Sequence, residues 1–82
     1  FFQLQAFPNP FSKEVQINYE LKEKDWVQLN VFDQLGRRLF SRREEIPAHQ
    51  VGMLSWQAPG PGTYFVQLAN SKHSTWLKLI SR

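Results

Sequence analysis

Val15-Gln16-Ile17-Asn18-Tyr19-Glu20-Leu21 is the stretch of this chain that decides its fold, because apolar and polar residues alternate strictly along it. Side chains of a β-strand point alternately to opposite faces, so this pattern predicts a strand with one buried face and one solvated face. The same alternation recurs in residues 27–31 and 64–68. Gln28 and Asn30 are predicted to face outward. The predicted inward residues are Val15, Ile17, Tyr19, Leu21, Val27, Leu29, Val31, Tyr64, Val66 and Leu68.

Weaker strands are predicted at residues 2–7, 37–43, 51–56 and 74–80. Apolar residues fall on both parities in these segments, so the sequence does not decide which face each strand buries. No long segment has helical periodicity with caps at both ends, because Pro47 interrupts residues 41–50.

The connections between the predicted strands have the composition of turns. Pro8-Asn9-Pro10 lacks two backbone N–H donors and has two restricted φ angles, so it ends the first strand. Asp33-Gln34-Leu35-Gly36 places an aspartate at the start of a turn and a conformationally permissive glycine at its end. Ala58-Pro59-Gly60-Pro61-Gly62 predicts a rigid loop without helix.

Length and composition indicate one small folded domain. The chain has 82 residues, of which 41% are hydrophobic and 15% aromatic. This is enough to bury a single core and too little for a catalytic cleft between two lobes. We therefore expect residues 1–82 to form one all-β domain, an immunoglobulin-like antiparallel β-sandwich of about seven strands. No apolar run is long enough to predict a membrane-spanning helix, and the start of the chain does not resemble a signal peptide.

The net charge is mildly positive, with ten Lys plus Arg against seven Asp plus Glu. Arg37, Arg38, Arg42 and Arg43 lie close together in the sequence. Such a cluster could bind phosphate or an acidic glycan, or it could keep an edge strand from pairing with another molecule, which is the commoner role. A nucleic-acid partner is not expected.

The sequence contains no recognisable arrangement of catalytic or metal-binding residues. Cysteine is absent, and His49 and His73 are isolated from each other and from other potential ligands. Glu44 and Glu45 are adjacent, so in a strand they face opposite sides and cannot act as a carboxylate pair. We predict that the chain is not an enzyme, that it has no catalytic, cofactor-binding or metal residues, and that it needs no cofactor.

The tryptophans could form a platform for stacking sugars, but in a small domain without disulfides they more often belong to the core. Trp56 is predicted to be buried, whereas strand parity leaves Trp26 and Trp76 open. Tyr64 follows a glycine turn and enters a strand, as in a tyrosine corner, where the hydroxyl ties down a loop.

Several motifs follow one another along the chain in this order: Phe7-Pro8-Asn9-Pro10-Phe11, Ile17-Asn18-Tyr19-Glu20-Leu21, Val31-Phe32-Asp33-Gln34-Leu35-Gly36-Arg37, Trp56, Gly62-Thr63-Tyr64-Phe65-Val66-Gln67-Leu68 and a short basic end. Their order resembles the type A C-terminal sorting domain of the type IX (Por) secretion system of Bacteroidetes. Together they span nearly the whole chain. The resemblance implies mainly structural roles for the motif residues Pro8, Asn9, Pro10, Phe11, Asp33, Gly36, Trp56, Gly62 and Tyr64.

Two positions depart from the pattern of this family. His49 stands where the family often has glycine before the fifth strand. Gln57-Ala58 follows Trp56 where Asp-Gly or Asn-Gly is common. Both departures are expected to lie in loops.

The resemblance implies that this domain is a secretion signal. Family members lie at the C-terminus of secreted enzymes and adhesins, direct them through the outer-membrane translocon, and are usually removed by a cell-surface sortase that joins the passenger to an anionic lipopolysaccharide. The expected partners are the translocon, the sortase and a covalently linked passenger located upstream, with the anionic lipopolysaccharide as a further candidate. The expected location is the cell surface or the medium, reached through the periplasm and outer membrane.

The resemblance also implies which residues are recognised. In related domains the basic terminal strand is part of what the translocon machinery recognises, and the last strand predicted here runs close to Arg82. The implied recognition residues are Lys78, Leu79, Ile80 and Arg82.

Two other functions stay open. One is a non-cleaved carbohydrate- or cell-surface-binding β-sandwich appended to a secreted enzyme. The other is a structural domain like the hook-capping immunoglobulin-like domain of flagellar assembly proteins, which shares parts of the motif pattern. A binding module would retain affinity for a glycan as an isolated domain, whereas a sorting module would be missing from the mature passenger.

Overall fold

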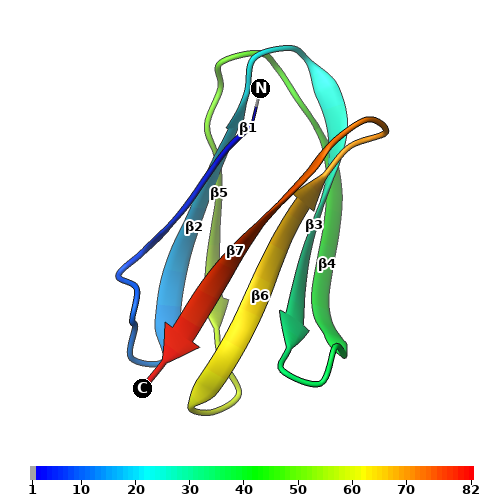
Figure 1. The fold of residues 1–82 in the computed structure, drawn as a ribbon. Helices are drawn as coiled ribbons and strands as arrows, with labels where there is room; N and C mark the ends of the chain where they lie inside the picture. Colours follow the sequence, from blue (N-terminus) through cyan, green and yellow to red (C-terminus); the bar gives the residue numbers. More distant parts are fainter. Residues whose placement is uncertain (1) are drawn as a thin grey trace.

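The structure, a computed structural model, describes residues 2–82 as seven strands joined by short connections (Figure 1). The strands are β1 (Phe2–Phe7), β2 (Glu14–Leu21), β3 (Asp25–Asp33), β4 (Arg38–Ile46), β5 (Gly52–Gln57), β6 (Gly62–Ala69) and β7 (Ser74–Ser81). Every strand predicted from the sequence is present. The described residues contain no helix, and hence none that could cross a membrane. The all-β prediction is confirmed.

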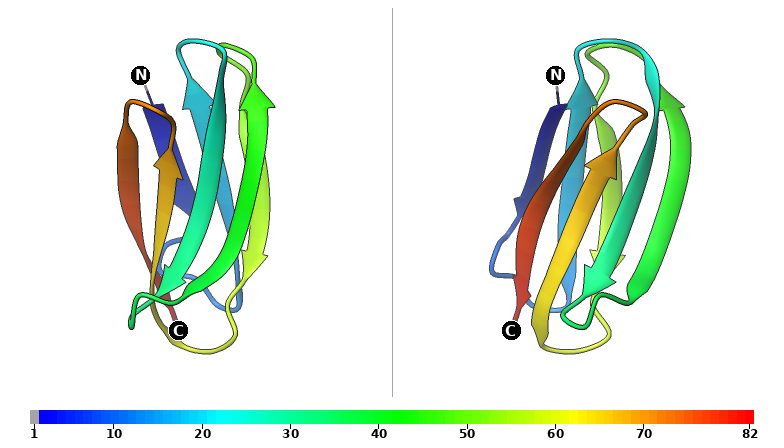
Figure 2. Two further views of the ribbon diagram at one scale, coloured as in Figure 1. Left: turned by 90° about the vertical axis from the view of Figure 1, so that its right-hand side faces the viewer. Right: turned by 45° about the vertical axis from the view of Figure 1, so that its right-hand side comes forward.

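The strands form two antiparallel sheets packed face to face (Figures 1 and 2). One sheet has three strands in the order β1-β2-β5, and the other has four in the order β4-β3-β6-β7. The chain passes from one sheet to the other between β2 and β3, between β4 and β5, and between β5 and β6. This is the predicted immunoglobulin-like sandwich, with β7 and β4 as the edges of the larger sheet.

The core lies between the two sheets and follows the period-two pattern of the sequence. All the predicted inward residues of β2, β3 and β6 are buried. Trp56 is also buried, as predicted, and its ring meets the ring of Tyr64 edge to face with centroids 5.1 Å apart. Phe11, from the connection between β1 and β2, closes one end of the core at 1% exposure.

Asn30 faces outward as predicted, yet it is only 6% exposed. Its neighbours on the outer face explain this burial. Gln28 Nε2 donates to Asn30 Oδ1 at 3.2 Å, and Asn30 Nδ2 donates to Gln67 Oε1 at 3.2 Å. The three amides therefore cover one another across β3 and β6, a cross-strand arrangement that residue parity alone does not predict.

The four clustered arginines do not form one surface. β4 is an edge strand, as the edge interpretation expected, but Arg42 points inward, toward the other sheet. Arg43 faces outward, with its guanidinium 5.4 Å from the centroid of the Trp26 ring. Arg37 belongs to the turn before β4 and pairs with Asp33. Strand parity separates Arg42 from Arg43, so the sequence cluster is divided between two faces.

Arg42 belongs to a polar network beside Tyr19. Its Nη2 donates to the Tyr19 hydroxyl and, at 3.0 Å, to the carbonyl of Met53, and it lies 3.5 Å from a Glu44 carboxylate oxygen. The Tyr19 hydroxyl donates to Glu44. Burial, and then the hydrogen bond to Glu44, raise the pKa of Tyr19. Charges that point inward on an edge strand oppose pairing with another molecule, which agrees with the edge-protecting interpretation.

Candidate recognition site at the terminal strand

Three of the four predicted recognition residues, Lys78, Leu79 and Ile80, lie on β7, an edge strand of the four-stranded sheet. β6 pairs with its inner edge, with Lys78 opposite Phe65 and Ile80 opposite Thr63. Alternation along β7 turns Lys78 and Ile80 to the outer face, where Lys78 is exposed and Ile80 is 40% exposed. Arg82 follows the strand and is exposed.

Leu79 is the exception among the predicted recognition residues. Its side chain is 0% exposed and belongs to the core. A partner of the folded domain therefore cannot contact it, which corrects the expectation for this residue. Parity could not decide this from the sequence, because Leu77, Leu79 and Ile80 are all apolar.

The outer edge of β7 is closed by the segment that follows β1. The backbone N–H of Phe11 donates to the carbonyl of Ile80 at 2.9 Å, and the N–H of Arg82 donates to the carbonyl of Phe11 at 2.8 Å. These bonds form an isolated parallel bridge between Phe11 and Ser81. Residues 9–11 thus act as a short extra strand beside the end of β7, next to the terminus marked C in Figure 1.

The side chain of Asn9 extends this pairing where a proline backbone cannot. Pro8 and Pro10 have no N–H group to donate. The side-chain amide of Asn9 both donates and accepts a hydrogen bond here. Its Nδ2 donates to the carbonyl of Lys78 at 2.9 Å, and its Oδ1 accepts from the N–H of Ile80 at 3.1 Å. The peptide bonds before both prolines are cis. The Pro8–Phe11 motif and β7, which lie at opposite ends of the sequence, are therefore joined in the folded domain.

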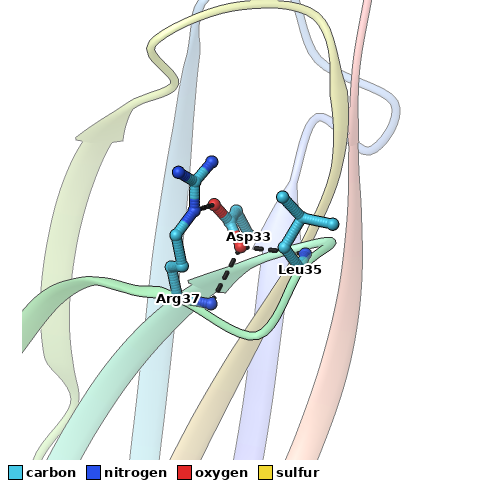
Figure 3. Close-up of polar contacts among 3 residues, drawn as sticks. All are labelled: Asp33, Leu35 and Arg37. Carbon is cyan, nitrogen blue, oxygen red and sulfur yellow. Dashed lines mark hydrogen bonds and ion pairs between the residues drawn. The ribbon is translucent and has the colours of Figure 1, made fainter.

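The turn between β3 and β4 is organised by Asp33 (Figure 3). Its Oδ1 accepts from the backbone N–H groups of Leu35 and Arg37, each at 2.9 Å, and its Oδ2 accepts from Arg37 Nε at 2.7 Å. Gly36 has φ of +83°, which L-residues adopt only with strain. Burial alone would raise the pKa of Asp33, but the hydrogen bonds from Arg37 and Leu35 outweigh it, so this pKa is lowered.

The loop between β5 and β6 is held by Tyr64. Its hydroxyl donates to the carbonyl of Gly60 at 2.7 Å, which is the hydrogen bond of a tyrosine corner, as expected from the sequence. Gly62 begins β6 with φ of +147°. The contacts of Asp33, Gly36, Trp56, Gly62 and Tyr64 all hold turns or core in place.

His49 has φ of +61°, in the left-handed region that favours glycine. This explains physically why glycine suits the position at which the chain departs from the family pattern. The His49 N–H donates to the carbonyl of Leu21 at 2.8 Å, so the loop keeps its place. Within residues 2–82, no group of three or more histidine, aspartate or glutamate side chains is arranged to hold a metal ion.

Comparison with known proteins places these features in a family. The model for "Secretion system C-terminal sorting domain" matches residues 5–82. No curated protein matches the chain. A crystal structure of dimeric latent PorU from Porphyromonas gingivalis is similar, with a TM-score of 0.69 and 16% sequence identity. The match covers 98% of this chain and 9% of the PorU chain, and at this identity it shows the fold alone.

Proposed function

We propose that β7, with the segment 9–11 that closes its edge, is the part of this chain that the type IX translocon recognises, given that the chain belongs to the family of secretion system C-terminal sorting domains. Sorting domains of this family direct proteins across the outer membrane to the cell surface or beyond. The family is not catalytic. Within this domain, the signal lies on the surface formed by β7 and the segment 9–11.

One observation carries this proposal: the hydrogen bonds that join Asn9 and Phe11 to Lys78, Ile80 and Arg82. The family match includes both segments, which are separated by almost the whole sequence. A recognition surface formed in this way exists only when the domain is folded, so an unfolded chain with the same terminal residues lacks it.

We propose separately what happens to the domain after transport. A passenger lies upstream, a cell-surface sortase removes the domain, and the passenger is joined to an anionic lipopolysaccharide. The intact mass of the full protein recovered from the cell surface tests this step. A mature protein that lacks residues 1–82 supports removal, and a mature protein that retains them contradicts it.

The recognition step is tested with a periplasm-targeted reporter fused to this chain in a bacterium with a type IX system. Lys78→Ala with Arg82→Ala removes only exposed charge, so stability should change by less than about 0.5 kcal/mol. We expect the wild-type fusion to reach the medium or cell surface and the double variant to remain largely in the periplasm. Lys22→Ala with Lys72→Ala removes equal charge at the opposite end of the sandwich and should export normally. Normal export of both double variants would show that the charges of β7 and Arg82 are not part of the signal.

A carbohydrate- or cell-surface-binding module is the second candidate, and the exposure of two tryptophans favours it. Trp26 is 50% exposed and Trp76 is 53% exposed, and both lie on the outer face of the four-stranded sheet. Such rings can stack on sugars. Retention of the domain on the mature protein together with glycan affinity of the isolated chain would support this function in place of sorting.

A further inference from the structure

The outer face of the four-stranded sheet carries a row of residues that crosses all four strands. Arg38 of β4 lies opposite Phe32 of β3, Phe32 lies opposite Phe65 of β6, and Phe65 lies opposite Lys78 of β7. Two aromatic rings therefore stand at the centre of the row and a cation stands at each end. With neighbouring strands about 4.8 Å apart, the two cations are roughly 14 Å apart at the backbone.

Trp76 completes the aromatic centre. It starts on β7, and its ring centroid lies 5.5 Å from that of Phe32 on β3, with the ring planes tilted by 38°. The indole therefore reaches across β6, and its 53% exposure leaves much of its surface open to solvent. We name the set of Phe32, Phe65, Trp76, Arg38 and Lys78 the outer patch.

The cations of the outer patch have no partner of opposite charge in the described part of the chain. Arg38 and Lys78 are both exposed, and neither forms an ion pair within residues 2–82. The carboxylate of Asp33, at this end of the sheet, is already bound by Arg37. A molecule that covers the outer patch is therefore favoured if it brings carboxylates to both ends of the row.

The arrangement also distinguishes between kinds of partner. Protein interfaces have an apolar centre enriched in aromatic residues and a polar rim. An extended polyanion is instead bound by cations that follow its backbone. In the outer patch the rings of Phe32 and Trp76 pack together at the centre, Phe65 lies opposite Phe32, and the cations lie at the rim, which matches a protein surface.

We propose that the outer patch docks an acidic protein surface of the secretion machinery, with Trp76 as the central anchor. The inference rests on the proposed sorting function and adds the face and the charge of the partner. Lys78 belongs both to this face and to β7, so the docking surface is continuous with the site at the strand end.

Trp26 provides a matched control for Trp76. The two indoles have nearly equal exposure, 50% and 53%, and share the same face of the sheet. Trp26, however, lies near the start of β3 opposite Glu45, beneath Arg43 and outside the outer patch. Replacement of either ring by serine removes exposed apolar surface, so both variants should keep the fold.

The test uses the reporter fusion with four variants whose folding is verified by circular dichroism and thermal unfolding. We expect export to fall by about tenfold or more in Trp76→Ser, as for loss of one anchor residue, and to be unchanged in Trp26→Ser. The charge reversal Arg38→Glu with Lys78→Glu should also abolish export. The reversal Lys22→Glu with Lys72→Glu, which changes net charge equally at other sites, should not.

Each outcome decides between the proposals. A wild-type fusion that stays in the periplasm refutes the sorting function itself. A wild-type fusion that is exported together with both outer-patch variants refutes the outer patch and leaves sorting intact. The isolated chain is also titrated with purified acidic cell-surface polysaccharide. Binding by the wild type that is lost in Trp76→Ser would assign the face to a glycan and overturn the protein partner, whereas no binding supports it.

Discussion

Asn9→Ala tests the link between the two ends of the sequence most directly. The change removes the bond to the carbonyl of Lys78 and the bond from the N–H of Ile80. A typical hydrogen bond contributes about 0.5 to 1.5 kcal/mol. Both bonds are exposed, so water replaces the lost partner and the lower end of that range applies. For the two bonds together we expect the free energy of unfolding to fall by about 1 kcal/mol.

Two assays measure the effect of Asn9→Ala. For a domain of this size, a loss of about 1 kcal/mol lowers the Tm by roughly 4 to 8 °C. Amide hydrogen exchange reports the bond itself, because the N–H of Ile80 loses its acceptor while the N–H groups of β6 keep theirs. We expect faster exchange at Ile80 with little change in the sheet interior.

Asn9→Asp is the matched control for this experiment. A carboxylate can still accept from the N–H of Ile80 but cannot donate to the carbonyl of Lys78. Exchange at Ile80 should therefore stay slow in this variant although stability falls. An unchanged Tm and unchanged Ile80 exchange in Asn9→Ala would refute the pairing of residues 9–11 with β7 in solution.

Gly36→Val should lower the free energy of unfolding by about 1 to 2 kcal/mol through backbone strain at φ of +83°, since no atom lies within 4 Å of a Cβ at this position. Gly60→Ala, also in open space but without a positive φ, is the control in the same urea titration, and equal loss in both variants would contradict the strain argument. Tyr64→Phe removes the bond to the Gly60 carbonyl and should cost about 1 kcal/mol in urea unfolding, and an unchanged midpoint would show that the corner bond does not contribute. The lowered pKa of Asp33 predicts a stabilising contribution that is present above the ordinary value of 3.8 and is lost as the pH falls through the lower folded value. Between neutral and acidic pH, the Tm of Asp33→Asn should fall less than the Tm of the wild type. An equal fall in both proteins would show that the Asp33 carboxylate does not contribute to the loss of stability in acid.

Strand alternation made the core of this fold predictable, because Val15, Ile17 and Tyr19 could be buried together only by a strand of period two. The burial of Trp56 was predictable on another ground, since a small domain without disulfides usually buries its large aromatic rings in the core. Strand alternation could not place Trp26 and Trp76, because apolar residues on both parities permit either facing until the register with neighbouring strands is known.

Contacts over long sequence separations were not predictable from the local pattern. Asn9 reaches Lys78 and Ile80 only because the sandwich brings β7 beside the connection that follows β1. The motif around Pro8 and Pro10 predicted a turn, and the sequence offered no signal for its pairing partner. Arg42 was expected among surface charges, and its inward position depends on the hydroxyl of Tyr19 across the sandwich and on the carboxylate of Glu44 on its own strand.

The direction of the strands has a mechanical consequence. β1 begins at one pole of the sandwich and β7 ends at the other, along a long axis of 35 Å (Figure 1). Tension between a protein joined ahead of β1 and a partner that grips the end of β7 therefore acts along the strands. Interstrand hydrogen bonds lie perpendicular to antiparallel strands, so such a pull shears them together instead of opening them one after another. The hydrogen bonds that Asn9 and Phe11 form with the end of β7 would resist this shear together with the interstrand bonds of the sheets. They lie at the end of β7, where the partner would hold the domain.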